Sequence, residues 1–167
     1  MLDLATNHAS VFVTYSSGFV RLFEKLDPPP HRTEKTKLYL FTGKSGTGKS
    51  RLAFELAGGT EGFYKRPGKW WDGYSQQRVV VLDDYRGDLD YNELLLLADR
   101  YPHRVEVKNG SAIFNSQLII ITSTKTCRHW YPDENEFSEL RRRTTYHTEN
   151  FCLEDVKTEL AMAAIEA

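Results

Sequence analysis

Residues 43–50 read Gly43-Lys-Ser-Gly-Thr-Gly-Lys-Ser50, and the expected fold can be worked out from them. It matches the pattern G-x-x-x-x-G-K-[ST] at every fixed position, between a run typical of a strand and a run typical of a helix. Its glycines allow backbone N–H groups to curl around phosphate oxygens, and the following helix N-terminus adds partial positive charge. The stretch therefore predicts a phosphate-binding loop made of Gly43, Lys44, Ser45, Gly46, Thr47, Gly48, Lys49 and Ser50.

The loop and a second motif together predict a site for ATP and Mg²⁺. Lys49 is expected to reach the β and γ phosphates as a catalytic residue, and the Ser50 hydroxyl to hold Mg²⁺. About thirty residues later, the apolar run 79–82 ends in two carboxylates, which is the expected second half of such a site. Asp83 is predicted to position Mg²⁺, and Asp84 to take a proton from the attacking water.

The pattern around these motifs alternates between short apolar strands and helices. Strands are expected at 38–41, 62–65, 79–82, 118–121 and 144–148, and helices at 50–57, 90–100 and 153–167. This alternation predicts an α/β fold with a central parallel sheet flanked by helices. Ligands gather at the carboxyl ends of parallel strands. Thr124, just after one strand, is therefore a candidate polar sensor of the γ-phosphate, although a strand simply running into a loop gives the same pattern.

Three further patterns carry charge or aromatic rings. Residues 105–114 predict a hairpin with an Asn109-Gly110 turn, whose tip residue Lys108 suits a DNA phosphate, although most turn lysines are merely solvated. The basic run 141–143 suits either a solvated helix face or an arginine offered to a neighbouring subunit's nucleotide. Residues 65–71 mix basic residues with Trp70 and Trp71 and could stack DNA bases, but a structural role is favoured for both tryptophans.

The prolines and the hydrophobic pattern divide the chain into segments. Three prolines at 28–30 open a linker over 28–36, after a helical segment at 1–27 whose helix could start at Ser16 or Ser17. The core is expected at 37–150, and a C-terminal helix or tail at 151–167.

Charge and apolar content exclude several classes of protein. The 22 Lys and Arg residues face 23 Asp and Glu residues, which excludes a polybasic binder but not a local basic surface. The two cysteines cannot build a disulfide framework and are expected to be free thiols. Neither a membrane span nor a signal peptide is apparent, so we expect the protein to function inside a cell without a membrane partner.

The order of the motifs resembles the helicase half of circovirus-type replication-initiator proteins (Rep) of circular single-stranded DNA viruses. The resemblance runs from about Leu2 to Arg143 and rests on an ordered set of motifs, of which only the phosphate-binding loop is common to many families. After that loop come Trp70–Tyr74, Val79–Asp84, Asp99–Pro102, Val105–Lys108, Ile121–Ser123 and Trp130–Tyr131.

The resemblance implies a superfamily-3 helicase with an AAA+-like core that forms a homo-oligomeric ring, usually a hexamer. Such a ring moves along single-stranded DNA from 3′ to 5′ during rolling-circle replication, in the host cell nucleus. The segment 1–27 would be its oligomerisation element. Lys49 and Ser50 match Walker A, Asp83 and Asp84 match Walker B, Lys108 with Asn109 matches the DNA-contacting hairpin, and Arg142 and Arg143 match paired arginines that include a finger.

Two departures from the family pattern are visible. Position 124 is threonine where the family's strand usually ends in asparagine, so a hydroxyl replaces an amide that orients water. No paired-histidine motif followed by a catalytic tyrosine segment is present, so we expect no DNA nicking.

Other functions stay open from the residues alone. A small-molecule kinase would share the phosphate-binding loop but act as a monomer without DNA. A GTPase is less favoured, because no Asn-Lys-x-Asp motif is present. A DNA-binding or assembly module with weak ATPase activity is the third reading, in view of Thr124. Stimulation of hydrolysis by single-stranded DNA separates these possibilities.

Overall fold

The structure is a computed structural model that describes residues 6–165. The chain divides into two units, residues 1–30 and residues 31–167, and each is described here by itself. In the first unit, helix α2 spans Ala9–Leu26 and is interrupted by non-helical backbone at Tyr15 (φ −119°, ψ 17°). The helix therefore begins well before Ser16, where a start was expected, and the interruption lies just before that residue.

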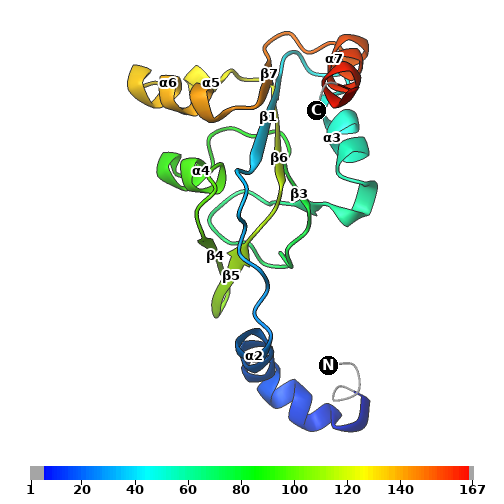
Figure 1. Cartoon of the computed structure of the whole chain (residues 1–167), viewed down its shortest axis with the longest axis vertical. Coiled ribbons are helices and arrows are strands. Elements are labelled where there is room, and N and C mark those ends of the chain that lie inside the picture. The colour runs from blue at the N-terminus through cyan, green and yellow to red at the C-terminus, as the bar shows by residue number, and fades with distance from the viewer. Residues whose placement is uncertain (1–5, 166–167) are drawn as a thin grey trace. The chain divides into compact units, whose positions relative to one another are not determined.

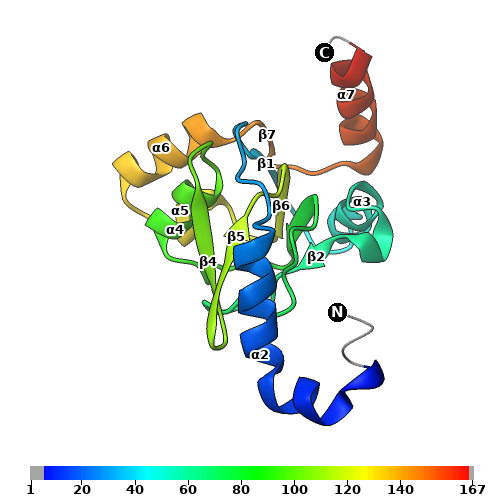
Figure 2. The same cartoon turned by 60° about the horizontal axis from the view of Figure 1, so that its bottom comes forward.

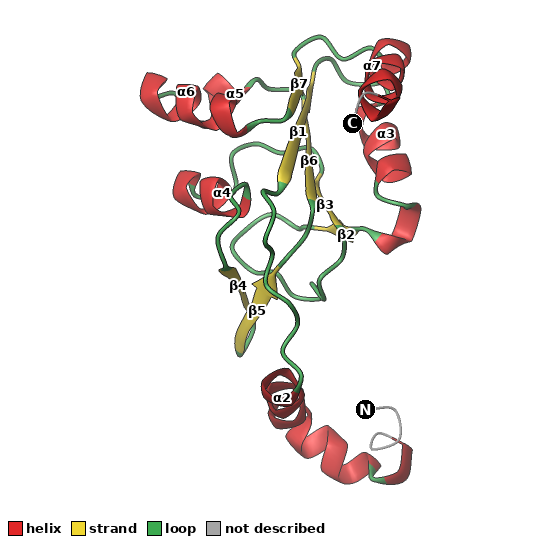
Figure 3. Cartoon of the chain, viewed as in Figure 1, coloured by secondary structure: helices red, strands yellow, loops and turns green. Residues whose placement is uncertain are grey.

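The second unit is built on five parallel strands in the order β2-β3-β6-β1-β7 (Figures 1 and 3). The strands are β1 (Lys37–Thr42), β2 (Phe63–Tyr64), β3 (Val79–Leu82), β6 (Leu118–Ser123) and β7 (Tyr146–Thr148). The chain leaves β1 toward β2 on one side and returns to β7 on its other side, so the order of connection reverses beside β1. The predicted α/β fold with a central parallel sheet is confirmed.

Helices cover both faces of this sheet (Figures 1 and 3). Helix α3 (Lys49–Leu56), the short helix η1 (Gly59–Glu61) and helix α7 (Leu153–Ile165) lie on one side, and α4 (Tyr91–Leu97), α5 (Cys127–Trp130) and α6 (Glu134–Arg143) lie on the other. Along β6, Ile119 and Ile121 join one apolar cluster and Ile120 joins the opposite one. This alternation follows from the two-residue period of a strand and explains why the run is apolar throughout.

The antiparallel hairpin pairs β4 (His103–Val107) with β5 (Gly110–Phe114) and is seen along its length in Figure 2. Val107 pairs with Gly110, so the two turn residues are Lys108 and Asn109 rather than Asn109 and Gly110. Asn109, the second turn residue, takes the left-handed conformation (φ 67°) that two-residue hairpin turns require. Lys108 and Asn109, the two residues predicted to contact DNA, thus form the tip of the hairpin.

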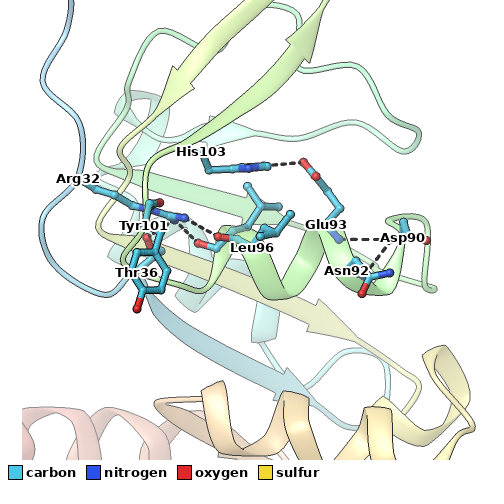
Figure 4. A network of polar contacts seen from close by, with 9 residues as sticks. Arg32, Thr36, Asp90, Asn92, Glu93, Leu96, Tyr101 and His103 are labelled. Carbon is cyan, nitrogen blue, oxygen red and sulfur yellow. Dashed lines mark hydrogen bonds and ion pairs between the residues drawn. The ribbon is translucent and has the colours of Figure 1, made fainter.

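Residues 31–36, expected to be linker, are bound to the core through Arg32. Its guanidinium donates hydrogen bonds to the carbonyl oxygens of Tyr101 (2.8 Å), Leu97 (2.5 Å) and Leu96. Figure 4 shows this side chain reaching the last turn of α4, which therefore ends at Leu97 and not at residue 100. Cationic donors satisfy the unpaired carbonyls of a helix C-terminus.

We expect Arg32→Met to lower the free energy of unfolding by about 3 kcal/mol, because it leaves partly buried carbonyl oxygens without a donor. Urea unfolding followed by circular dichroism measures this change. Arg51→Met is the matched control, because Arg51 is exposed and makes an i,i+4 ion pair with Glu55, typically worth about 0.5 kcal/mol or less. Equal loss in both variants would contradict the assigned role of Arg32.

No helix among residues 6–165 is long and apolar enough to cross a membrane. Cys127 and Cys152 are free thiols, as their spacing predicted. Cys127 is buried, and this burial raises the pKa of its thiol to about 11.

Candidate nucleotide-binding site

The phosphate-binding loop leaves the carboxyl end of β1 and enters α3. Gly43, Gly46 and Gly48 adopt φ values of 151°, 80° and 94°, which residues other than glycine rarely adopt. A Cβ atom at Gly43 would also lie 2.9 Å from the backbone nitrogen of Phe151. Backbone conformation therefore favours glycine at all three positions, and close packing adds a second requirement at Gly43.

Lys49, the first residue of α3, is buried against the loop that precedes it. Its Nζ donates hydrogen bonds to the carbonyl oxygens of Gly43 (2.9 Å) and Lys44 (2.6 Å) and to Thr47 Oγ1 (3.3 Å). Burial lowers the pKa of Lys49, while the carboxylates of Asp83 and Asp84 act in the opposite direction. The ammonium group thus lies inside the loop, facing negative charge from β3.

A cavity of about 440 Å³ opens beside this loop. Three parts of the fold line it: the loop with the first turn of α3, Asp84 after the end of β3, and the carboxyl end of β6. Its lining consists of Ser45, Gly46, Gly48, Lys49, Ser50, Arg51, Asp84, Thr122, Ser123 and Thr124. Of the residues assigned to catalysis, the cavity brings together Lys49, Asp84 and Thr124, at the strand ends where parallel sheets bind ligands.

Thr122, which the sequence pattern does not single out, binds the Asp83 carboxylate and the backbone of Asp84. Thr122 Oγ1 donates to Asp83 Oδ1 (2.6 Å) and accepts a hydrogen bond from the backbone nitrogen of Asp84 (3.0 Å). Asp84 has left-handed backbone (φ 48°), a conformation that costs free energy for a residue with a side chain, and its carboxylate lies 2.9 Å from Arg86. Asp83 lines a smaller neighbouring cavity instead. The signal for Thr122 was its place in the hydroxyl run 122–124.

The C-terminal segment flanks the same loop. Thr42 Oγ1 donates to the Thr148 carbonyl (2.8 Å), and the Phe151 nitrogen donates to the Thr42 carbonyl (3.1 Å). The Lys157 ammonium lies 2.8 Å from Glu55 of α3, and α7 is seen beside α3 in Figure 1. The sequence predicts only a helix or tail for this segment, because its contacts with residues 42 and 55 depend on the folding of the sheet.

The hairpin and the arginine pair lie away from the cavity. β5 runs into β6, and α6 runs into β7, so both meet the sheet at the amino ends of its parallel strands. The phosphate-binding loop follows the carboxyl end of β1, about 16 Å farther along six residues of strand. Lys108, Asn109, Arg142 and Arg143 therefore do not reach the nucleotide site of their own chain.

The structure distinguishes the two arginines. Arg143 lies 2.6 Å from Glu139 on its own helix and 3.8 Å from Asp99 beyond α4, and its side chain is only 25% exposed. Arg142 is exposed. Arg143 thus ties α6 to the core, whereas Arg142 extends into solvent.

The glycine loop, the buried lysine and the paired carboxylates at the ends of parallel strands define a P-loop nucleotide-binding protein. A family model described as RNA helicase matches residues 39–125. The chain is 44% identical to the replication-associated protein of goose circovirus over 84% of its own length and 47% of the relative's. Its identity to the replication-associated proteins of canary circovirus and of beak and feather disease virus is 43% and 42%, over 86% and 87% of this chain and 49% of each relative.

The chain therefore belongs to the RNA helicase family, as a superfamily-3 type helicase domain related to circovirus replication-associated proteins. The match confirms the resemblance found in its motifs. The chain spans about half the length of the curated relatives it matches.

Proposed function

We propose that this chain is an ATP-driven motor domain that moves along single-stranded DNA during viral replication. The observation that carries the proposal is the cavity in which Lys49 lies across from Asp84 and Thr124. A buried cation, a carboxylate and a hydroxyl at one set of strand ends suit the binding and hydrolysis of a nucleoside triphosphate. Membership of a helicase family supports coupling of that hydrolysis to nucleic acid.

The donor groups of the site fit Mg²⁺ bound together with a nucleotide. Ser50 lines the cavity and Asp83 lines the smaller cavity beside it, and the two supply hydroxyl and carboxylate oxygens, which Mg²⁺ prefers. Among the described residues, no group of three or more His, Cys, Asp or Glu side chains could hold a metal ion by itself. Ser50 and Asp83 would therefore hold the ion jointly with the triphosphate, where its charge would offset that of the phosphates.

Each of the remaining groups has a separate role in ATP hydrolysis. The loop backbone and Lys49 hold the phosphates. Asp84 is the general base for water, and Thr124 orients that water through its hydroxyl. Thr122 fixes the positions of Asp83 and Asp84 through its two hydrogen bonds, so it acts as a positioning residue.

A ring of identical chains, most simply the family's hexamer, would complete the site. Arg142 lies at the amino edge of the sheet and cannot reach its own cavity, but it is free to enter that of an adjacent subunit. In the first unit, Leu22 and Leu26 of α2 are 50% and 72% exposed, which suits an oligomerisation segment at residues 1–27. The 3′ to 5′ direction, the rolling-circle setting and the host nucleus are carried over from the resemblance.

The test of the proposed function is ATP hydrolysis with Mg²⁺, measured with and without single-stranded DNA. We expect turnover that rises when DNA is added. Turnover indifferent to DNA would favour the small-molecule kinase. DNA binding without turnover would favour a binding or assembly module.

Lys108→Ala is expected to weaken binding of single-stranded DNA and to reduce the slope of log affinity against log salt by about 0.7, the value for one phosphate contact. The Lys108 side chain is 70% exposed at the hairpin tip, so its removal does not disturb packing. Fluorescence anisotropy over a series of salt concentrations measures both quantities. Arg128→Ala is the control, since it removes one exposed cation from α5, which follows the carboxyl end of β6. An unchanged slope in Lys108→Ala would contradict the phosphate contact.

A further inference from the structure

The two consecutive tryptophans have opposite environments. Trp71 is 1% exposed and lies in an aromatic cluster with Phe63, Tyr74 and Phe114, which confirms its structural role. Trp70 is 43% exposed, so the expectation that both rings lock the loop against the core is wrong for Trp70. Burial of one ring directs its neighbour along the chain to the surface.

The segment that carries Trp70 is attached to the hairpin on both sides of that residue. The Trp71 nitrogen donates a hydrogen bond to the carbonyl oxygen of Glu106 on β4 (2.8 Å). The next residue, Asp72, accepts a hydrogen bond from the Lys108 nitrogen (2.7 Å) at the tip. On the other side, the Lys69 ammonium lies 3.2 Å from the Glu106 carboxylate. Trp70 is therefore held at the side of the hairpin and moves with it.

The surface around Trp70 combines an aromatic face with positive charge. Lys69 Nζ lies 4.4 Å from the centre of the Trp70 ring, and the Lys69 side chain is 66% exposed. The Lys108 ammonium lies 3.6 Å from Asp72 and is also largely exposed. Exposed ion pairs of this kind are weak, so both ammonium groups can exchange their carboxylate for a phosphate. The Trp70 ring is 43% exposed, and among the side chains that the structure describes its one ring contact is with Lys69, which a base would displace.

We propose that Trp70 is a base-stacking residue for single-stranded DNA, with Lys69 and Lys108 contacting the phosphates on either side of the stacked base. The proposal rests on the proposed function, because it assumes that the hairpin meets DNA. Stacking tolerates any base, since every base presents a π face, and thus suits a motor that passes over all sequences. Each subunit would hold the strand through a charge contact that depends on salt and a stacking contact that does not.

The test compares two strands of equal length, a thymidine oligonucleotide and the same backbone without bases, by anisotropy with a slowly hydrolysed ATP analogue present. Trp70→Ala is expected to weaken binding of the thymidine strand about tenfold, to leave binding of the abasic strand unchanged, and to leave the salt slope unchanged. Trp70→Phe should retain most of the affinity for the thymidine strand. Lys108→Ala should weaken binding of both strands and lower the slope.

The outcomes separate this proposal from the proposed function. If wild-type protein binds neither strand, both fail. If it binds and Lys108→Ala weakens binding, but Trp70→Ala leaves the ratio of the two affinities unchanged, the hairpin role stands and the stacking role is overturned. Equal weakening toward both strands by Trp70→Ala would also overturn it, because loss of the loop's shape affects a backbone without bases as well. Unfolding of Trp70→Ala in urea should match wild type, since the ring is exposed.

Discussion

Lys49→Ala should lower the rate of ATP hydrolysis by about 100- to 1,000-fold while the chain stays folded. Lys49 is the buried cation of the phosphate-binding loop, and stabilising charge on the transferred phosphoryl group is its role in the proposed mechanism. Its hydrogen bonds to the Gly43 and Lys44 carbonyls show that the ammonium lies within the loop rather than in solvent. Steady-state phosphate release at saturating ATP, Mg²⁺ and DNA measures the change.

Lys35→Ala is the matched control for this experiment, because it also removes one positive charge and Lys35 is exposed in the segment before β1. It should hydrolyse ATP at the wild-type rate. Circular dichroism must show a native spectrum for Lys49→Ala. Wild-type turnover by a folded Lys49→Ala protein would exclude the cavity as the hydrolytic site.

Arg142→Ala is expected to reduce turnover by about 1,000-fold, the lower end of what an arginine finger contributes. Arg143→Ala should act differently, since Arg143 joins Glu139 and Asp99 within its own chain. Its main effect should be a lower free energy of unfolding, by about 1 kcal/mol for partly exposed ion pairs. Turnover and urea unfolding of the two variants, measured side by side, separate the two roles.

Mixing the two inactive variants tests whether Arg142 acts between subunits. A Lys49→Ala chain retains Arg142, and an Arg142→Ala chain retains an intact phosphate-binding loop. Where the two are adjacent in a ring, one complete site forms, so the mixture should recover hydrolysis that neither variant shows alone. A mixture as inactive as its components would contradict a finger supplied by the neighbour.

Local sequence determined the phosphate-binding site to a large extent. The glycine positions, Lys49 and the strand ending in Asp83 and Asp84 can all be predicted from the sequence, because backbone conformation and phosphate chemistry restrict those residue types at that spacing. The parallel sheet followed from apolar strands alternating with helices. Helix ends were less accurate, as α4 shows, because its last carbonyls are satisfied by Arg32, a residue more than sixty positions away.

Which groups lie together depends on the pairing of strands that are distant in the sequence. Thr122 meets Asp83 and Asp84 because β3 and β6 are adjacent, and the C-terminal segment reaches the loop because β7 pairs with β1. The separate environments of Trp70 and Trp71, like those of Arg142 and Arg143, also depend on which long-range partner each one meets. A motif specifies residues whose requirements are local, whereas burial and ion pairing arise from contacts between distant segments, which a single sequence does not encode in its spacing.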